Sequence, residues 1–298
     1  MWNRLDLRHA RRPQSQQALL ALHSSGSSGR QWEPYRALLP AGTRLRAPDL
    51  IGYGDGPAWP LGASVTLEAE AQRLARWLPH GPGGVHLVGH SYGGAVALEL
   101  AFRWPERVRS LTLYEPVRFA MLRADGDGSQ WRDIVQVGRD IGALTLTGRI
   151  HEAGEVFVDY WSGPGAWTRL SPARRNTIAV RMPKVRAEFE ALFSDDAPPK
   201  AFHRLAMPVR LLCGSRSPRA ARRVVELLGA ACPAATTTCM EGLGHMGPLE
   251  APARLIDQFA WCGDAEVPGS APPAHSLSRN GNGWARQRTH EEQDLCAQ

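Results

Sequence analysis

Residues 89–93 read Gly-His-Ser-Tyr-Gly, a G-x-S-x-G pattern with Ser91 at its centre. The apolar run at 84–89 predicts a buried strand, and the alanine-rich segment at 92–104 predicts a helix. A strand that turns directly into a helix holds the serine in a strained conformation that only small neighbours permit, and it exposes the hydroxyl at the helix N-terminus. We therefore expect Ser91 to be a nucleophile, with the backbone N–H of Tyr92 donating to a developing oxyanion.

Outward from this motif, short apolar runs alternate with helical patterns, which predicts an α/β fold of parallel strands joined by crossover helices. The expected strands cover residues 18–23, 43–49, 84–89, 108–114, 208–213 and 235–240. The expected helices cover residues 30–39, 67–78, 92–104, 218–228 and 248–261. Residues 117–200 show helical segments and aromatic residues without a clear strand, so we interpret them as an insertion between two strands of one sheet.

The 298 residues, 43% of them hydrophobic, suffice for one large α/β core with an inserted subdomain. We assign the core to residues 1–116 and 201–262 and the insertion to residues 117–200. The segment 263–298 is rich in Pro, Gly, Ser, Asn and charge and carries few large apolar residues, so we expect a disordered C-terminal tail.

The overall composition argues against several classes of function. The formal charge is +6, but the arginines are scattered and lysine occurs only at Lys184 and Lys200, which argues against nucleic-acid binding. There is no apolar run long enough to cross a bilayer, so no membrane association is expected. The five cysteines have no metal-type spacing, which argues against a disulfide framework or a zinc site and favours the reducing cytoplasm.

Four motifs stand in an order and spacing that resemble the α/β-hydrolase superfamily. They are His-Ser-Ser-Gly-Ser-Ser at 23–28, Asp-Leu-Ile-Gly-Tyr-Gly at 49–54, Gly-His-Ser-Tyr-Gly-Gly at 89–94 and Gly-His-Met at 244–246. The likeness covers about residues 15–262. It implies the α/β-hydrolase fold, a mostly parallel central sheet flanked by helices, with residues 117–200 as a helical cap over the active site.

The resemblance also assigns the general base and a second oxyanion donor. His245 lies in a glycine-flanked loop after the last expected strand, where the family carries its base histidine. The loop at 23–26 resembles the family's oxyanion loop, with Ser24 in place of the usual glycine, and by position the N–H of Ser25 is the second donor. The hydroxyl of Ser24 is a candidate substrate contact, whereas His90 is expected to be buried packing.

The acid of the triad is where the sequence departs from the family. The family places an aspartate where this chain has Ser217, which cannot carry the charge that stabilises an imidazolium. Either the site is impaired or another carboxylate acts. Glu115 is the best substitute, because it follows the strand at 108–114 and therefore opens on the same face as the nucleophile. Glu115 as a solvated strand-end residue remains an alternative, as do three acids of the insertion, Asp125, Asp195 and Asp196.

Aromatic residues of the insertion suggest an apolar pocket, although most of them are expected to pack the cap onto the core. We take Trp161 and Trp167 as candidate substrate contacts. There is no Walker A motif and no His-Glu-x-x-His motif, so no cofactor and no metal are expected.

These observations favour a serine hydrolase that transfers the acyl group of an ester-like or activated carbonyl to water. The expected partner is a small, partly apolar substrate, and the chain is expected to be a monomer or a homodimer. Hydrolysis of a C–C bond and a cofactor-free perhydrolase activity use the same residues and remain open. A catalytically weak protein that binds a small ligand also remains open, because of Ser217.

Overall fold

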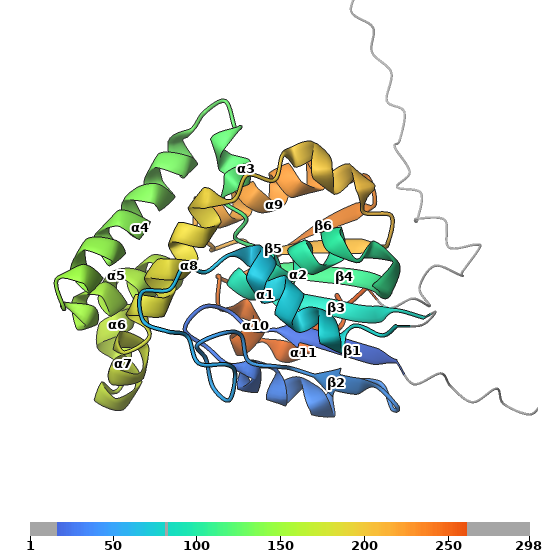
Figure 1. Cartoon of the computed structure of the whole chain (residues 1–298), viewed down its shortest axis with the longest axis horizontal. Coiled ribbons are helices and arrows are strands. Elements are labelled where there is room, and N and C mark those ends of the chain that lie inside the picture. The colour runs from blue at the N-terminus through green and yellow to red at the C-terminus, as the bar shows by residue number, and fades with distance from the viewer. Residues whose placement is uncertain (1–16, 81–82, 261–298) are drawn as a thin grey trace, which may run out of the picture. The chain divides into compact units, whose positions relative to one another are not determined.

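The computed structural model of the protein describes residues 17–80 and 83–260, so the expected tail at 263–298 lies outside the described residues (Figure 1). Six strands form one sheet in the order β2-β1-β3-β4-β5-β6, and all of their pairings are parallel. The strands are β1 (Ala18–Leu22), β2 (Arg44–Arg46), β3 (Val85–His90), β4 (Val108–Tyr114), β5 (Val209–Gly214) and β6 (Ala235–Met240). The predicted fold class, a parallel α/β-hydrolase sheet, is confirmed.

Burial along the strands follows their position in the sheet. Every residue of β3 is buried, because helices cover both of its faces, and a continuous apolar run is typical of such a strand. Strand β6 lies at the sheet edge and exposes Thr236, Thr237 and Cys239. Successive side chains of β1 point to opposite faces of the sheet. Leu20 and Leu22 therefore belong to one apolar cluster, and Leu19 and Ala21 belong to the other.

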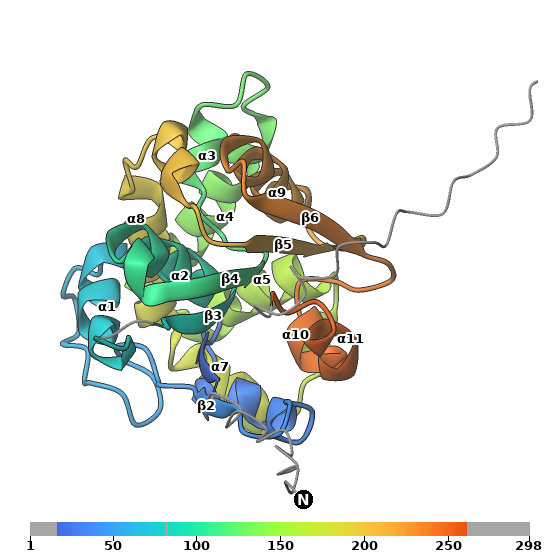
Figure 2. The same ribbon diagram turned by 90° about the vertical axis from the view of Figure 1, so that its right-hand side faces the viewer.

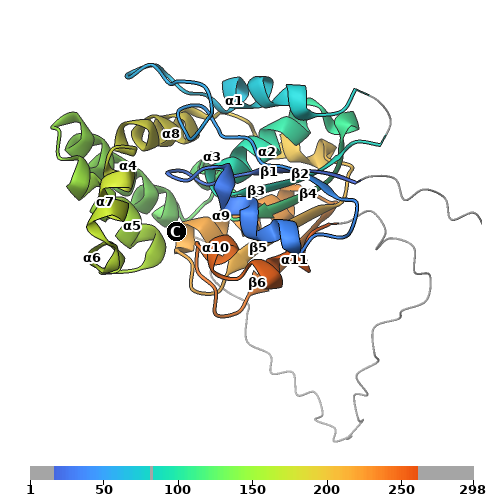
Figure 3. The same cartoon turned by 90° about the horizontal axis from the view of Figure 1, so that it is seen from below.

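Helices cover both faces of the sheet (Figure 3). One face packs against α1 (Leu67–Leu74), α2 (Tyr92–Arg103) and α9 (Arg219–Ala231), and Figure 2 shows α9 alongside β5 and β6. The other face packs against the 3-10 helix η1 (Gly29–Ala37) and α11 (Pro252–Ile256), with α10 (Gly247–Glu250) just before it. Because helices pack on both faces, the ends of the strands are held in place and can position the side chains that follow them.

Two predicted helices differ from the structure. The segment predicted at 30–39 is the 3-10 helix η1, which contains Pro34 and therefore lacks one N–H donor of an α-helix. The helix predicted at 248–261 is two short helices, α10 and α11, separated at Ala251. Ala251 has φ −139° and ψ 56°, because Pro252 disfavours the helical conformation in the residue before it.

Between β4 and β5 the chain contains six α-helices and no strand. They are α3 (Ala120–Arg123), α4 (Ser129–Leu146), α5 (Ile150–Ser162), α6 (Ala166–Arg169), α7 (Pro172–Ala179) and α8 (Met182–Ser194). Figure 1 shows α4 to α8 grouped at the carboxyl end of the parallel strands. None of the helices in the described ranges is long and apolar enough to cross a membrane.

Candidate active site

Ser91 occupies the turn between β3 and α2, with φ 55° and ψ −122°. Only glycine fits two residues before it and two residues after it. A Cβ atom on Gly89 would lie 2.6 Å from the Gly93 carbonyl oxygen, and one on Gly93 would lie 2.3 Å from the carbonyl oxygen of His23. The Ser91 N–H donates to the Tyr114 carbonyl of the adjacent strand over 3.0 Å. These close approaches hold the strained serine in one conformation, as the sequence pattern predicts.

Two backbone N–H groups stand near the serine without an internal partner. Tyr92 is the first residue of α2, so its N–H has no intrahelical acceptor. The N–H of Ser25 has no hydrogen-bond partner among the described residues. Its loop is fixed by its neighbours, since the Gly26 N–H donates to the Tyr53 hydroxyl over 3.1 Å.

His23, which begins this loop, is buried and neutral. Its Nδ1–H donates to the Ser24 carbonyl over 2.8 Å, and its Nε2 accepts the Leu50 N–H over 3.0 Å. Burial lowers the pKa of His23 to about 4, and this outweighs the opposing effect of Asp49, whose carboxylate lies 3.9 Å away. Through these two hydrogen bonds, the His23 ring fixes the path of the loop at 23–26.

His245 lies in the loop between β6 and α10, and its Nε2 is 3.0 Å from the Ser91 Oγ. Three contacts position this loop at the sheet end. The Tyr114 hydroxyl donates to the Gly244 carbonyl over 2.6 Å, and the Arg216 N–H donates to the Leu243 carbonyl over 2.9 Å. The carbonyl of His245 itself accepts a hydrogen bond from the His90 ring over 2.8 Å.

Glu115 supplies the carboxylate on the far side of the imidazole. Its Oε2 is 2.5 Å from the His245 Nδ1, and its Oε1 accepts the Gly214 N–H over 2.7 Å. Glu115 has φ 46°, and it and Ser91 are the two non-glycine residues of the described ranges with positive φ. Glu115, His245 and Ser91 are 0%, 3% and 5% exposed. Strain and burial at both ends of one hydrogen-bonded chain are typical of a functional site.

The other candidate positions for the acid do not reach His245. Asp125 is paired with Arg223, and Asp195 is paired with Arg118. Asp196 lines a separate cavity near α1 and α2. Ser217 lies three residues after the end of β5, and its buried hydroxyl has no hydrogen-bond partner among the described residues. Of these carboxylates, only Glu115 is therefore brought to the imidazole.

A buried hydrogen-bond chain that the sequence did not predict connects the loop at 23–26 to His245. The N–H and the hydroxyl of Ser24 both donate to Gln31 Oε1, over 3.1 and 3.0 Å. Gln31 Nε2 donates to His90 Nδ1 over 3.1 Å, which leaves the His90 Nε2–H to donate to the His245 carbonyl. Burial lowers the pKa of His90 well below its usual range, so the ring stays neutral and keeps this tautomer. His90 is buried, as the sequence predicts, but it also joins Gln31 to the His245 carbonyl through two hydrogen bonds.

A cavity of about 460 Å³ opens over Ser91, between the oxyanion loop and the cap. Ser24, Ser25, Trp161 and His245 line it, together with side chains of α5 and α7. Ser24 lines this cavity and its hydroxyl donates to Gln31 Oε1, so its contact with substrate stays a prediction.

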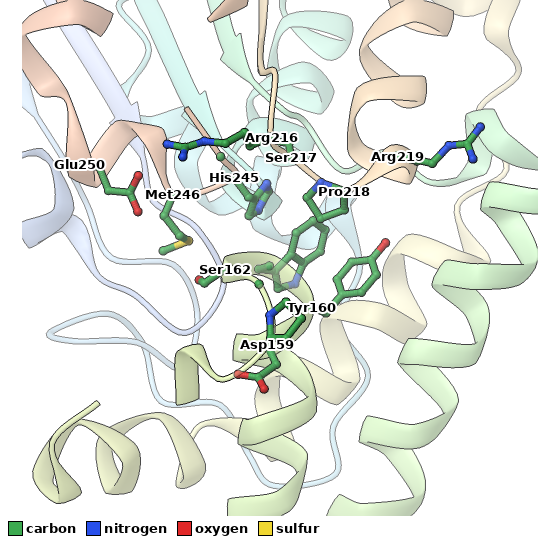
Figure 4. A pocket seen from close by; sticks show the side chains of 14 residues that line it. Asp159, Tyr160, Ser162, Arg216, Ser217, Pro218, Arg219, His245, Met246 and Glu250 are labelled. Atoms are coloured by element: carbon green, nitrogen blue, oxygen red, sulfur yellow. The ribbon is translucent and has the colours of Figure 1, made fainter. Parts of the chain in front are cut away.

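A second cavity, of about 670 Å³, also borders His245 (Figure 4). The close-up shows His245, Met246 and Ser217 facing it, and Ser91 is not among its lining residues. Trp161 belongs to the walls of both cavities. Its ring stacks on the His245 imidazole with centroids 3.9 Å apart and planes at 26°, so Trp161 touches the imidazole directly.

The position of Trp167 does not fit the prediction that this residue contacts substrate. It is buried within the cap, where its ring packs against Gly154 of α5 and meets the His151 ring edge to face. It lines neither of the two cavities beside His245. Its backbone N–H donates to Asp159, which also accepts the Gly165 N–H and so fixes the turn before α6. Trp167 therefore packs the cap together.

The arrangement can move a proton between a hydroxyl and an imidazole while a buried carboxylate holds the opposite ring nitrogen. Two free N–H groups beside the hydroxyl can bind negative charge on an oxygen. In the described ranges, no group of three or more His, Cys, Asp and Glu side chains is placed to hold a metal ion.

Comparison with known proteins agrees with this geometry. A family model described as the alpha/beta hydrolase family matches residues 19–258. A pimeloyl-[acyl-carrier protein] methyl ester esterase of Aromatoleum aromaticum is 29% identical over 252 residues, which cover 78% of this chain and 93% of that protein. A 2-hydroxy-6-oxo-2,4-heptadienoate hydrolase of Pseudomonas putida is 32% identical over 124 residues, which cover 38% of this chain and 42% of that protein.

Among solved structures, a hydrolase of Pseudomonas aeruginosa superposes with a TM-score of 0.64 at 21% identity. The superposition covers 82% of this chain and 89% of that one. At this level of identity the likeness supports the fold alone.

Proposed function

The chain belongs to the alpha/beta hydrolase family, and on that premise we propose that it cleaves an ester-like or activated carbonyl through an acyl-enzyme on Ser91. The single observation that carries the proposal is the continuous chain Ser91–His245–Glu115, with separations of 3.0 and 2.5 Å. The esterase from Aromatoleum aromaticum, which is similar over most of its length, supports an ester as the substrate.

In the proposed first half-reaction, the Ser91 Oγ attacks the carbonyl carbon while its proton passes to His245 Nε2. The carbonyl π electrons move onto oxygen, where the N–H groups of Ser25 and Tyr92 stabilise the charge. Glu115 accepts the Nδ1–H and so stabilises the imidazolium. The imidazolium then gives its proton to the leaving alcohol oxygen as the C–O bond breaks and the acyl group stays on Ser91.

In the second half-reaction, water attacks the acyl carbon while His245 Nε2 takes the water proton. The imidazolium returns that proton to the Ser91 Oγ as the acyl–oxygen bond breaks, so the products are a carboxylic acid and the free enzyme. The proposed role of Glu115 removes the main reason to expect a mere ligand-binding protein, because the acid missing at Ser217 is supplied from the neighbouring strand.

The test is turnover of p-nitrophenyl esters of increasing acyl length, with rapid-quench mass spectrometry of the acylated protein. We expect turnover and an acyl adduct on the peptide that contains Ser91. The Ser91→Ala variant should show neither, while Ser194→Ala, at an exposed serine of α8 outside the site, should retain both. An adduct on a different residue would contradict the assignment of the nucleophile.

C–C bond hydrolysis is a second candidate, supported by the partial likeness to the 2-hydroxy-6-oxo-2,4-heptadienoate hydrolase. It is tested by following the absorbance of a 2-hydroxy-6-oxo-dienoate mixed with the protein. A kcat/KM for this dienone above those of all the esters would favour the C–C hydrolase over the esterase. Cofactor-free perhydrolysis, tested with acetate and hydrogen peroxide, is the remaining alternative for the same residues.

A further inference from the structure

The cavity over Ser91 has an unusual charge. Three arginines line it, Arg30 from η1, Arg174 from α7 and Arg181 just before α8, and its described lining residues include no aspartate or glutamate. The second cavity beside His245 differs, because Asp159 and Glu250 line it along with two arginines. Of the two cavities beside His245, the one that Ser91 lines is therefore the one with an excess of positive charge.

None of these three arginines is neutralised by a carboxylate among the described residues. Some other arginines of the cap are paired with acids, as Arg149 is with Glu152 and Arg186 with Glu190. Three like charges around one cavity repel one another, and this repulsion is relieved when an anion binds between them. A cavity wall that keeps its cations unpaired is therefore suited to an anionic ligand.

Arg181 is held in place before any ligand binds. Its NH1 donates to the Gly26 carbonyl over 2.5 Å, and its guanidinium lies 5.9 Å from the centre of the Tyr53 ring. The side chain is partly buried, and Gly26 belongs to the same loop that carries the Ser25 N–H. A guanidinium presents five N–H donors, so one bond to Gly26 leaves others for a ligand. Arg181 thus links the charged wall to the proposed oxyanion site.

Three serines of the loop before η1 line the same cavity. Ser25, Ser27 and Ser28 line the cavity, and their hydroxyls donate to no protein group in the described part of the chain. Guanidinium groups combined with hydroxyls are a donor set that carboxylates and phosphates accept from. The apolar residues Phe157, Val158 and Ile178 line the rest and can receive a short hydrocarbon chain.

We propose that the substrate is an ester whose acyl chain carries a second, anionic group, a carboxylate or a phosphate, bound by the arginine wall formed by Arg30, Arg174 and Arg181. This proposal rests on the proposed hydrolase function. The apolar residues accommodate the chain between the two ends, while the scissile carbonyl lies at Ser91. A volume of about 460 Å³ is of the size that small-molecule ligands occupy.

The first test compares two esters that differ in one charge. Mono-p-nitrophenyl glutarate carries a free carboxylate, and its methyl ester is the neutral partner. We expect kcat/KM to be tenfold or more higher for the anion at low salt, because hydrogen bonds to charged groups are stronger than neutral ones, and to fall as salt is added. A p-nitrophenyl ester with a terminal phosphonate distinguishes a carboxylate site from a phosphate site by which anion has the higher kcat/KM.

The double variant Arg174→Gln/Arg181→Gln should reduce the anion-to-neutral ratio of kcat/KM towards one. The neutral ester is the internal reference, so any general damage to the oxyanion loop cancels in the ratio. Arg139→Gln, on the exposed side of α4, is the matched control and should keep the wild-type ratio. A wild-type ratio near one, or an unchanged ratio in the double variant, would overturn the proposal.

A binding measurement separates this proposal from the proposed function. Calorimetric titration of the Ser91→Ala protein with monomethyl glutarate and with dimethyl glutarate requires no turnover. We expect the monoanion to bind at least tenfold more tightly, and the double arginine substitution to remove the difference. Equal affinity, or no binding of either, would reject the arginine wall even if esters are hydrolysed. Tighter binding of the anion without any ester turnover would keep the wall and reject the hydrolytic role.

Discussion

The carboxyl edge of the sheet and the cap over it contribute different things to the site. Ser91 and Glu115 end adjacent strands, and both are locked by positive φ, close backbone contacts and burial. The cap contributes Trp161, stacked on the His245 ring, and two arginines that face the cavity. The difference suggests that the residues at the carboxyl ends of the strands carry the proton transfers, while the cap sets the shape and the charge of the cavity. Substitutions at the edge should therefore affect the rate far more than substitutions in the cap.

The largest effect is expected for Ser91→Ala, at the sheet edge. Loss of the attacking oxygen should lower kcat by about 10⁵-fold or more, since residues of such a unit act together. Steady-state turnover of a p-nitrophenyl ester measures this, with far-UV circular dichroism to show that the fold is kept. A decrease of less than tenfold would mean that the edge does not carry the chemistry.

The next largest effect is expected for Glu115→Gln. The amide keeps the shape of the side chain but not its charge, so it no longer stabilises the imidazolium or holds the His245 tautomer, and kcat should fall by about 10³- to 10⁴-fold. Asp125→Asn is the matched control in the cap, because Asp125 is paired with Arg223 away from the site. Turnover of Glu115→Gln within threefold of the wild type would reject Glu115 as the acid.

Acid should destabilise the core through its buried histidines. In the unfolded chain His23 takes up a proton near pH 6.5, whereas in the folded protein its pKa is about 4. The unfolded state therefore binds more protons between these values, and the free energy of unfolding falls as pH drops from about 6.5 to 4, by on the order of 3 kcal/mol for this residue.

Urea unfolding at several pH values measures this dependence. His23→Gln should show a shallower acid loss, and His80→Gln, at an exposed position, should follow the wild type. Equal slopes for the wild type and His23→Gln would contradict the neutral, buried state of His23.

The smallest effect is expected in the cap, where Trp161 and Trp167 can be compared directly. Trp161→Phe keeps an aromatic ring near His245 but reduces the wall between the two cavities, so kcat/KM should change by roughly tenfold or less and bulkier esters should gain relative to small ones. Trp167→Phe should instead lower the melting temperature and leave the relative rates for different esters unchanged, because Trp167 packs inside the cap. The opposite pattern would interchange the roles assigned to the two residues.

The sequence predicted the sheet edge better than the cap for a physical reason. In a parallel sheet the carboxyl ends of the strands meet on one side, so placing Ser91, Glu115 and His245 after strands was enough to bring them together. The insertion was recognised as helical, but which face of each helix turns inward depends on packing against distant residues. That is why Trp161 and Trp167 could not be told apart before the structure.

The link through Gln31 was also missed. Gln31 lies in a 3-10 helix 59 residues before its partner His90, and no spacing signal in the sequence connects them. The sequence shows Ser24 where the family has glycine, but the consequence, a hydroxyl donated to Gln31, depends on the position of that helix. Buried polar chains of this kind are set by tertiary structure.

The most direct measurement of the central claim is the rate at which a fluorophosphonate labels the protein, because the reagent reports on the activated serine whatever the natural substrate is. We predict labelling of Ser91 alone in the wild type, and a rate at least a hundredfold lower in both His245→Gln and Glu115→Gln. Labelling of Glu115→Gln at the wild-type rate, or modification of a residue other than Ser91, would contradict the account.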